Sequence, residues 1–361
     1  MYTAYALGNC WNILRNNWSI YKVHCRKPYP SIGYRAMGPK CRKFVSVIID
    51  VNQFGVSTVF VLLSSKTIHD MVKTLTSTDI SYCFVVLIVA VCLLPVTWLK
   101  SPQDFWLAVM VAMLTVFIAI ILVFVGIALD YGLCSPYTGN DVYCDFRDVP
   151  PISAKNLFLS LGTIMFACGG HAAFPTVQHD MKDPGEYTKS VVSAFIALFS
   201  LYGPVAIFGY LAYHGAVRDS ILPSVQAEWI QHTCNALITI HCILTVTIII
   251  SPLNQDLEDL FHCPHCPSIL DLHILAVFGG FYNSVLDFGW QRALIRTATM
   301  LGIVIVCESI PNFGPILDLI GGSTMTLASV ILPCVFYLYL LAREEKAKKF
   351  GKVDAPPSFK E

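Results

Sequence analysis

The chain has 361 residues, of which 55% are hydrophobic and 13% are charged, and its formal net charge is zero. Because a soluble globular chain carries about 25% charged residues, this composition excludes an ordinary soluble protein and indicates a polytopic membrane protein. No basic patch with interleaved aromatic residues points to nucleic acid as a partner. The start of the chain lacks the basic leader and the apolar core of a signal peptide.

A membrane-spanning helix needs about 20 mostly apolar residues. This criterion predicts an all-α polytopic membrane protein with about eight complete transmembrane helices, over residues 44–64, 80–98, 105–129, 157–177, 191–213, 233–252, 293–310 and 315–341. The last of these spans is long, and we expect it to tilt or to bend near Gly321 and Gly322.

The expected regions are the tail of an incomplete membrane helix (1–15), a cytoplasmic basic loop (16–43), a transmembrane domain (44–341) and a cytoplasmic tail (342–361). With residues 15–43 in the cytoplasm, alternating spans place 19 of the 24 Lys and Arg residues on that side, as the positive-inside rule requires. The apolar stretch within 265–288 carries Asp271 and Asp287, which are costly at the bilayer centre. A span there would also turn the basic tail outward, so we expect a non-spanning insertion.

The first complete span carries Asp50, Asn52 and Gln53, and positions 50 and 53 share one helix face. An ionisable side chain inside a span is a functional hypothesis by default. Asp50 could bind a coupling ion such as a proton, or pair with the amine of a ligand. It could equally belong to a satisfied polar cluster between helices, and the sequence leaves both interpretations open.

Two pairs of cysteines lie outside the spans. Cys134 and Cys144 share an outward loop in an oxidising setting, which favours a disulfide, although spacing alone does not show the geometry. The motif CPHC at 263–266 has metal-ligand residue types at CxxC spacing. It faces the reducing cytoplasm without a second pair, so we expect free thiols and no metal site.

The span 157–177 is broken at its centre by Gly169 and Gly170 and again by Pro175. Lipid offers no partner for a backbone freed from a helix, so a broken span lies buried in protein or lines a cavity. Broken helices of this kind form midplane substrate sites in secondary transporters. The alternative is a kinked helix packed through small residues, which are common in membrane spans.

His241 lies inside the span 233–252, close in sequence to Thr245 and Thr247. Hydroxyl and carbonyl oxygens there could coordinate a coupling cation, or the hydroxyls could bond to their own helix. Further along, Glu308 and Asp318 flank a short outward turn. They could act as gate residues or lie at the wet ends of two helices.

No catalytic arrangement is present in the sequence. Signatures of serine hydrolases, zinc proteases and phosphate-binding loops are missing, and no nucleophile is paired with His171 or His179. We therefore expect a protein that is not an enzyme and that needs no cofactor.

Long motifs carry a family resemblance. The stretch TIMFACGGHAAFPTVQHDMKDPGEYTKSV (163–191) resembles the broken sixth helix and following loop of the amino acid/auxin permease family. The run ESIPNFGPILDLIGGSTMTLASVILPCVFYLYL (308–340) is similar to its ninth and tenth helices, and CWNILRNNW, YPSIGYRAMG and SPLNQDLEDL fit the same family. The proton-coupled and vesicular inhibitory amino acid transporters are the members that look most similar.

The resemblance implies a transporter fold of two inverted five-helix repeats, with substrate held between unwound first and sixth helices. On this pattern Phe166, Gly169, Gly170 and His171 fall at the unwound part of the sixth helix and would bind an amino acid's charged ends. The implied function is secondary active transport of neutral amino acids by alternating access, coupled to protons or sodium. The membrane would be the plasma membrane or a lysosomal or vesicular one.

Against the family pattern, this chain is expected to lack the first and eleventh helices, to keep only the tail of the second, and to carry the 265–288 insertion. The mixed character of this insertion suggests a retained intron or gene-model artefact. The inverted repeat would then be incomplete. The alternative function is a truncated, non-transporting membrane protein that acts as a partner or an amino acid sensor, or a non-functional partial gene product. Measured amino acid uptake separates these alternatives.

Overall fold

The structure of the chain is a computed structural model. It describes residues 28–76, 80–98, 106–131, 135–137, 141–143, 153–213, 217, 220–261 and 290–350. The predicted partial span at 1–15, Cys134, Cys144, the CPHC motif and the 265–288 insertion lie outside the described residues.

The chain divides into two compact units. Unit 1 comprises Met1–Asn52, Ile152–Ser200 and Leu317–Glu361, and unit 2 comprises Gln53–Pro151 and Leu201–Ile316. Three helices cross these boundaries in the sequence: α3 (Pro39–Thr76), α8 (Tyr187–Tyr213) and α12 (Phe313–Ile320). Each unit is described in turn.

Unit 1 is built from short and interrupted helices. Besides its parts of α3, α8 and α12, it contains α2 (Pro28–Met37), α6 (Ala154–Ala167), η3 (His171–Ala173), α7 (Phe174–Asp180), η4 (Pro184–Glu186), the π-helices η7 (Gly321–Met325) and η8 (Leu327–Ile331), and α13 (Leu332–Phe350). Its core joins α2 to α13: Tyr29 and Phe336 are buried with ring centroids 5.8 Å apart, edge to face. The Tyr29 hydroxyl also donates to the Ala328 carbonyl at 2.5 Å, so its polar end is satisfied.

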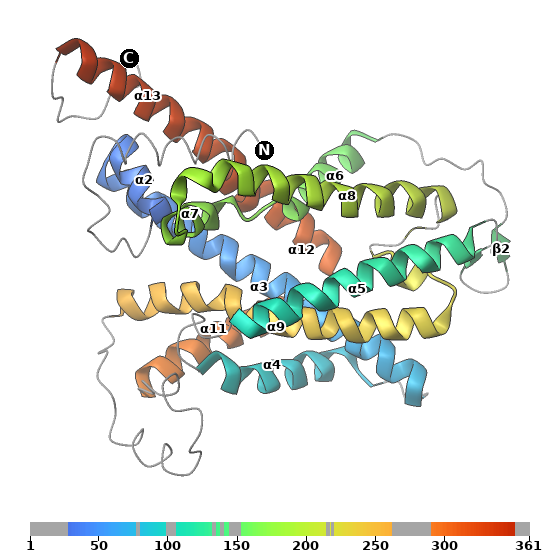
Figure 1. Cartoon of the computed structure of the whole chain (residues 1–361). Helices are drawn as coiled ribbons and strands as arrows, with labels where there is room; N and C mark the ends of the chain where they lie inside the picture. Colours follow the sequence, from blue (N-terminus) through green and yellow to red (C-terminus); the bar gives the residue numbers. More distant parts are fainter. Residues whose placement is uncertain are drawn as a thin grey trace. The chain divides into compact units, whose positions relative to one another are not determined.

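Unit 2 consists mainly of long apolar helices. Besides its parts of α3, α8 and α12, it contains α4 (Tyr82–Trp98), α5 (Trp106–Asp130), the antiparallel strands β1 (Ser135–Tyr137) and β2 (Asp141–Tyr143), η6 (Leu222–Ser224), α9 (Glu228–Leu260) and α11 (Trp290–Ser309). Helix α5 packs along α9, and α4 packs against α11 (Figure 1). The α5–α9 core includes Val123, Ile127 and Ile230, and at its end buried Asp130 accepts from the Tyr213 hydroxyl at 2.6 Å.

The predicted all-α polytopic architecture is confirmed, since each of the eight predicted spans lies mainly on helix, with 157–177 interrupted between α6 and η3. Six described helical segments are long and apolar enough to cross a membrane, and Tyr82–Trp98 is a shorter apolar helix. The long uninterrupted apolar runs explain this agreement, because in lipid a backbone satisfies its hydrogen bonds within its own helix.

Two boundaries differ from the sequence prediction. The predicted loop 16–43 contains helix α2 and the start of α3, because Tyr29, Ile32 and Ala36 form an apolar stripe that is buried in the core of unit 1. The last described helix, α13, continues to Phe350, past the predicted end of the last span at residue 341. An ion pair between Lys348 and Glu344 at i,i+4 spacing, 3.1 Å apart, supports this extension.

Candidate functional site

The predicted break in the sixth family helix is present in unit 1. Helix α6 ends at Ala167, and its last turn is closed by bonds from the Cys168 N–H to the Ile164 carbonyl and from the Gly169 N–H to the Phe166 carbonyl, at 3.0 and 3.1 Å. Gly170 then takes φ +100°, a left-handed conformation that only glycine adopts without strain. The short helices η3 and α7 follow, so Gly170 separates two helical segments.

Helix α6 approaches the Gly321 region closely through two glycines. A Cβ at Gly162 would lie 2.6 Å from the Asp318 carbonyl oxygen, and a Cβ at Gly321 would collide with the Gly162 carbonyl. Next to this contact, the Thr163 hydroxyl donates to Asp318 Oδ1 at 2.5 Å. Membrane helices pack closely where small residues let their backbones approach. This contact therefore holds α6, just before the break, against the segment that carries Asp318 and Gly321.

The four predicted substrate residues occupy one continuous stretch with different environments. Phe166 is half-buried, and Gly169 faces the thioether of Met325, which occupies the place of a Cβ. Gly170 is exposed, and a Cβ built there would meet no described atom within 4 Å. His171 is only 4% exposed, and its ring packs against Phe174 and Phe195 at centroid distances of 4.8 and 5.8 Å. The open space therefore adjoins the backbone of Gly170 rather than the imidazole.

The part of α3 that belongs to unit 1 contacts η7, the π-helix that begins at Gly321. The Thr324 hydroxyl donates to the amide oxygen of Asn52 at 3.0 Å, and Asn52 is 8% exposed. Asp50, a predicted coupling residue, lies two residues earlier on the same helix and is half-buried. The sequence marked Asn52 as polar within a span but gave no sign of Thr324 as its partner, because the two lie 272 positions apart.

Two π-helical segments, η7 and η8, follow Gly321 with one residue, Thr326, between them. The Thr326 hydroxyl donates to the carbonyl of Gly321 at 2.7 Å, five residues earlier. Single π turns are rare and often occur at functional sites. Gly321 and Gly322, where a tilt or bend was predicted, thus begin a stretch of widened helix in the same unit as the break at Gly170.

The remaining candidate coupling residues lie in unit 2. His241 Nδ1 lies 2.9 Å from the Ala112 carbonyl of α5, and His241 Nε2 lies 3.5 Å from the Thr245 hydroxyl. The Thr247 hydroxyl donates to the Leu244 carbonyl at 2.7 Å, which is the bond to its own helix that the sequence had left open. His241 and Thr245 are therefore held in one local network, whereas Thr247 is turned to its own backbone.

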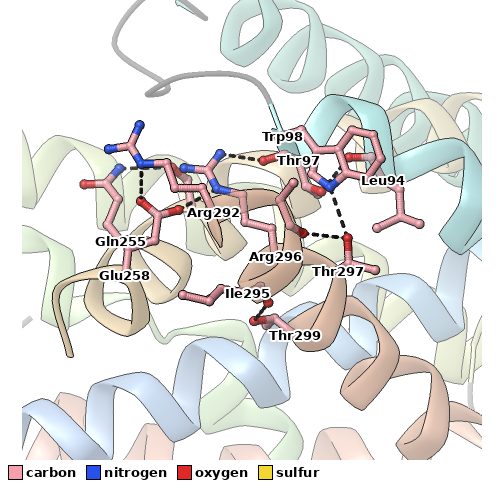
Figure 2. Close-up of polar contacts among 12 residues, drawn as sticks. Leu94, Thr97, Trp98, Gln255, Glu258, Arg292, Ile295, Arg296, Thr297 and Thr299 are labelled. Carbon is pink, nitrogen blue, oxygen red and sulfur yellow. Dashed lines mark hydrogen bonds and ion pairs between the residues drawn. The ribbon is translucent and has the colours of Figure 1, made fainter. Parts of the chain in front are cut away.

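A buried ion cluster that the sequence did not single out joins three helices of unit 2 (Figure 2). Arg296 Nε lies 2.7 Å from Glu258 Oε1, and Arg292 Nε lies 3.3 Å from Glu258 Oε2. Arg296 Nη1 also donates to the Thr97 carbonyl at 2.7 Å, near the end of α4. A cation at the C-terminal end of a helix is favourable, as Arg296 is at the end of α4. Because Arg296 lies on α11 and also pairs with Glu258 of α9, which is 1% exposed, it links all three helices.

The predicted gate residues belong to different units. Asp318, in unit 1, is half-buried and bonded to Thr163. Glu308, in unit 2, is half-buried, and its Oε1 finds no hydrogen-bond partner among the described residues. Among all the residues that the structure describes, no group of three or more His, Cys, Asp or Glu residues could hold a metal ion.

Comparison with known proteins gives one family. A family model described as transmembrane amino acid transporter protein matches residues 1–354. The Arabidopsis thaliana amino acid transporters AVT1C and AVT1D are 22% and 25% identical to this chain over 324 and 329 residues, covering 88% and 87% of it but only 53% and 52% of their own length. AVT1H from the same plant is 26% identical over 346 residues, which is 93% of this chain and 71% of AVT1H.

The chain thus spans about half the length of AVT1C and AVT1D. No solved structure gives a significant match.

Proposed function

The chain belongs to the transmembrane amino acid transporter family, and from this premise we propose that it moves a neutral amino acid across a membrane by secondary active transport. The observation that carries the proposal is the break at Gly170, where an exposed backbone adjoins open space inside an otherwise apolar helix. In the proposed cycle the two sides of the membrane gain access to this site in turn.

The chemistry of the break suits the charged ends of an amino acid. Carbonyl groups at the C-terminal end of α6 carry partial negative charge and suit the ammonium group. Backbone N–H groups at Gly170 and His171, at the start of η3, can donate to the carboxylate in this proposal. Met325, which takes the space beside Gly169, and Phe166 would line the side-chain end of the ligand.

Neutral substrates are favoured by the composition of the break. Between Thr163 and Gln178, His171 is the one residue of a basic or acidic type, and it is packed among aromatic rings. A substrate with a charged side chain would find no opposite charge in this stretch, and an unpaired charge in a low-dielectric site is costly.

The driving ion is a proton or sodium in this proposal. Asp50 in unit 1, and Thr245 and Thr247 in unit 2, are the candidate coupling residues. Glu308 and Asp318 are proposed gate residues. The proposed location is the plasma membrane or a lysosomal or vesicular membrane.

Uptake by the purified chain in proteoliposomes tests the proposal. Tritiated neutral amino acids are offered one at a time, with an imposed proton gradient, an imposed sodium gradient, or neither. We expect saturable uptake of at least one of them under one gradient, lost in Gly170→Leu and kept in the matched control Gly203→Ala, where a Cβ meets no described atom within 4 Å.

The same measurement separates the alternative function. Saturable binding of the amino acid without flux under any gradient would contradict transport and support a sensor or partner role. Equal uptake by wild type and Gly170→Leu would show that the substrate does not use the break.

A further inference from the structure

His241 is held in one tautomer by the backbone of a neighbouring helix. Its Nδ1 atom lies 2.9 Å from the Ala112 carbonyl of α5. A carbonyl oxygen only accepts hydrogen bonds, so Nδ1 carries the hydrogen and the lone pair of the neutral ring lies on Nε2. The same carbonyl accepts from the Thr115 hydroxyl at 2.9 Å, and Ala112 is 4% exposed, so the accepting residue is buried while the His241 ring is half-buried.

The Nε2 lone pair faces a group that can donate a hydrogen bond to it. Thr245, one turn further along α9, has its hydroxyl oxygen 3.5 Å from His241 Nε2. A hydroxyl can donate to a bare imidazole nitrogen or accept from a protonated one. The geometry therefore accommodates both the neutral and the protonated ring without loss of the bond to Ala112.

An aromatic ring also lies beside the imidazole. The centroid of Phe60, on α3, is 6.2 Å from that of His241. The face of an aromatic ring attracts a cation within about 6 Å of its centroid. The Phe60 ring thus lies at the limit of that range and makes the α3 side of His241 aromatic.

Charged groups are absent from the helix segments that contact His241. Helix α5 has no titratable residue between Trp106 and Leu129, and α3 has none between Asp50 and Lys66. On α9 itself, Cys242 adjoins His241, and the nearest charged or basic residues are His232 and Asp256.

Two further helices pack against α9, and they add no charge at mid-span. Helix α4 carries Cys83 and Cys92 with Tyr82 at its start, and α11 carries Cys307 near its end. The charged residues of α11 are Arg292 and Arg296 near its start and Glu308 near its end. Among the described helices of unit 2, His241 is thus an isolated basic group inside a span, which marks a functional residue by default.

We propose that His241 is the residue that binds the coupling proton, with Thr245 as its hydrogen-bond partner. This inference rests on the proposed transport function and identifies the coupling ion as a proton. A proton from water on one side adds to the Nε2 lone pair, and the ring becomes a cation that donates to Thr245. Loss of the same proton from Nε2 to water on the other side restores the neutral ring.

Variants of similar shape separate protonation from packing. In His241→Asn the amide nitrogen takes the place of Nδ1 and still donates to Ala112, but the side chain cannot bind a proton. We expect uptake driven by a proton gradient to fall by about tenfold or more, while exchange of external labelled for internal unlabelled amino acid, without a gradient, stays within about twofold of wild type. Thr245→Val keeps the shape but removes the acceptor, and should weaken the response to the gradient, whereas the control Thr233→Val, whose hydroxyl donates to the Trp229 carbonyl of its own helix, should not.

Full gradient-driven uptake in His241→Asn would overturn the proposal, and so would wild-type uptake that depends on sodium alone. If wild type shows neither uptake nor exchange of any neutral amino acid, the transport function itself fails, and a measurement without substrate then decides the state of His241.

That measurement is nitrogen NMR of the whole chain in detergent, with histidine labelled with ¹⁵N. Signals lost in His241→Asn belong to His241 among the 10 histidines of the chain. We expect a protonated Nδ1 and a bare Nε2 in the neutral ring, and a proton on both nitrogens after acidification of the sample. The opposite tautomer, or no second proton after acidification, would contradict the proposal even if transport is observed.

Discussion

Arg296 and Glu258 form a buried ion pair, with Arg296 Nε 2.7 Å from Glu258 Oε1 and side chains that are 8% and 1% exposed. The pair connects α11 to α9, and the second bond of Arg296, to the Thr97 carbonyl, adds α4. Since these three helices belong to unit 2, the pair holds one unit together. Removal of Glu258 would take away the buried carboxylate that both Arg296 and Arg292 contact.

The first prediction concerns this pair. We expect Glu258→Ala to lower the free energy of unfolding by about 3–5 kcal/mol, because Arg296 and Arg292 would lose their buried counter-charge. Thermal unfolding of the purified protein in detergent measures the effect. The control is Glu186→Ala, which breaks the exposed pair with Lys189 at 2.9 Å and should cost less than about 1 kcal/mol. Equal losses for the two variants would show that burial does not increase the contribution of the Glu258 pair to the free energy of unfolding.

The second prediction concerns the left-handed residue Gly170. We expect Gly170→Ala to cost about 1–2 kcal/mol, because an L-residue is strained at φ +100° although the space around it is open. Gly170→Asn should cost less, because asparagine tolerates left-handed conformations better than alanine. Thermal unfolding of the three proteins checks this order. If alanine and asparagine are equally harmless, the chain does not keep a left-handed residue at this position.

The third prediction concerns the close packing of α6. Gly162→Ala places a methyl group 2.6 Å from the Asp318 carbonyl oxygen, a backbone atom that cannot rotate away. We expect a loss of about 1–3 kcal/mol from overpacking, measured as a lower unfolding temperature. The matched control, Gly203→Ala within α8, should be neutral or stabilising by up to about 1 kcal/mol, because alanine favours helix more than glycine does. A stable Gly162→Ala protein would show that α6 is free to move from Asp318.

The fourth prediction concerns Cys134 and Cys144. In sequence they immediately precede β1 and follow β2, strands that pair antiparallel with Ser135 opposite Tyr143. We expect a disulfide between them, seen as a crosslinked peptide by mass spectrometry after digestion without reductant. Alkylation in detergent at denaturing concentration should label two more thiols after reduction than before. Cys83 and Cys92, which are free cysteines, serve as the positive control for labelling. Full labelling before reduction would contradict the bond.

The features that the sequence predicted correctly are local ones. Apolar length placed the helices, because a span in lipid must satisfy its own backbone. The Gly169–Gly170 pair predicted the break in α6, because a left-handed residue there requires glycine. Helix α2 was missed although its signal was present: prolines suit a first helical turn, and Tyr29, Ile32 and Ala36 follow helical spacing.

The features that were missed are contacts between distant positions. Glu258 and Arg296 lie 38 positions apart and on different helices, so no periodicity indicates that they meet. Asn52 and Thr324 are 272 positions apart, and Thr163 and Asp318 are 155 apart. In each case the packing of helices, rather than the residue pattern along one helix, selects the partner.

The π-helical segments η7 and η8, between Gly321 and Ile331, determine which side of α13 faces α2. A π turn takes one more residue than an α turn, so each one rotates everything after it by about 100° about the helix axis. A helical wheel drawn straight through from Phe313 would therefore assign Phe336 to the wrong side. Deletion of a single residue within η7 would restore ordinary helix at that point and turn Phe336 away from Tyr29. Both α12 and α13 would remain helical, but α13 would be rotated about its axis relative to α12.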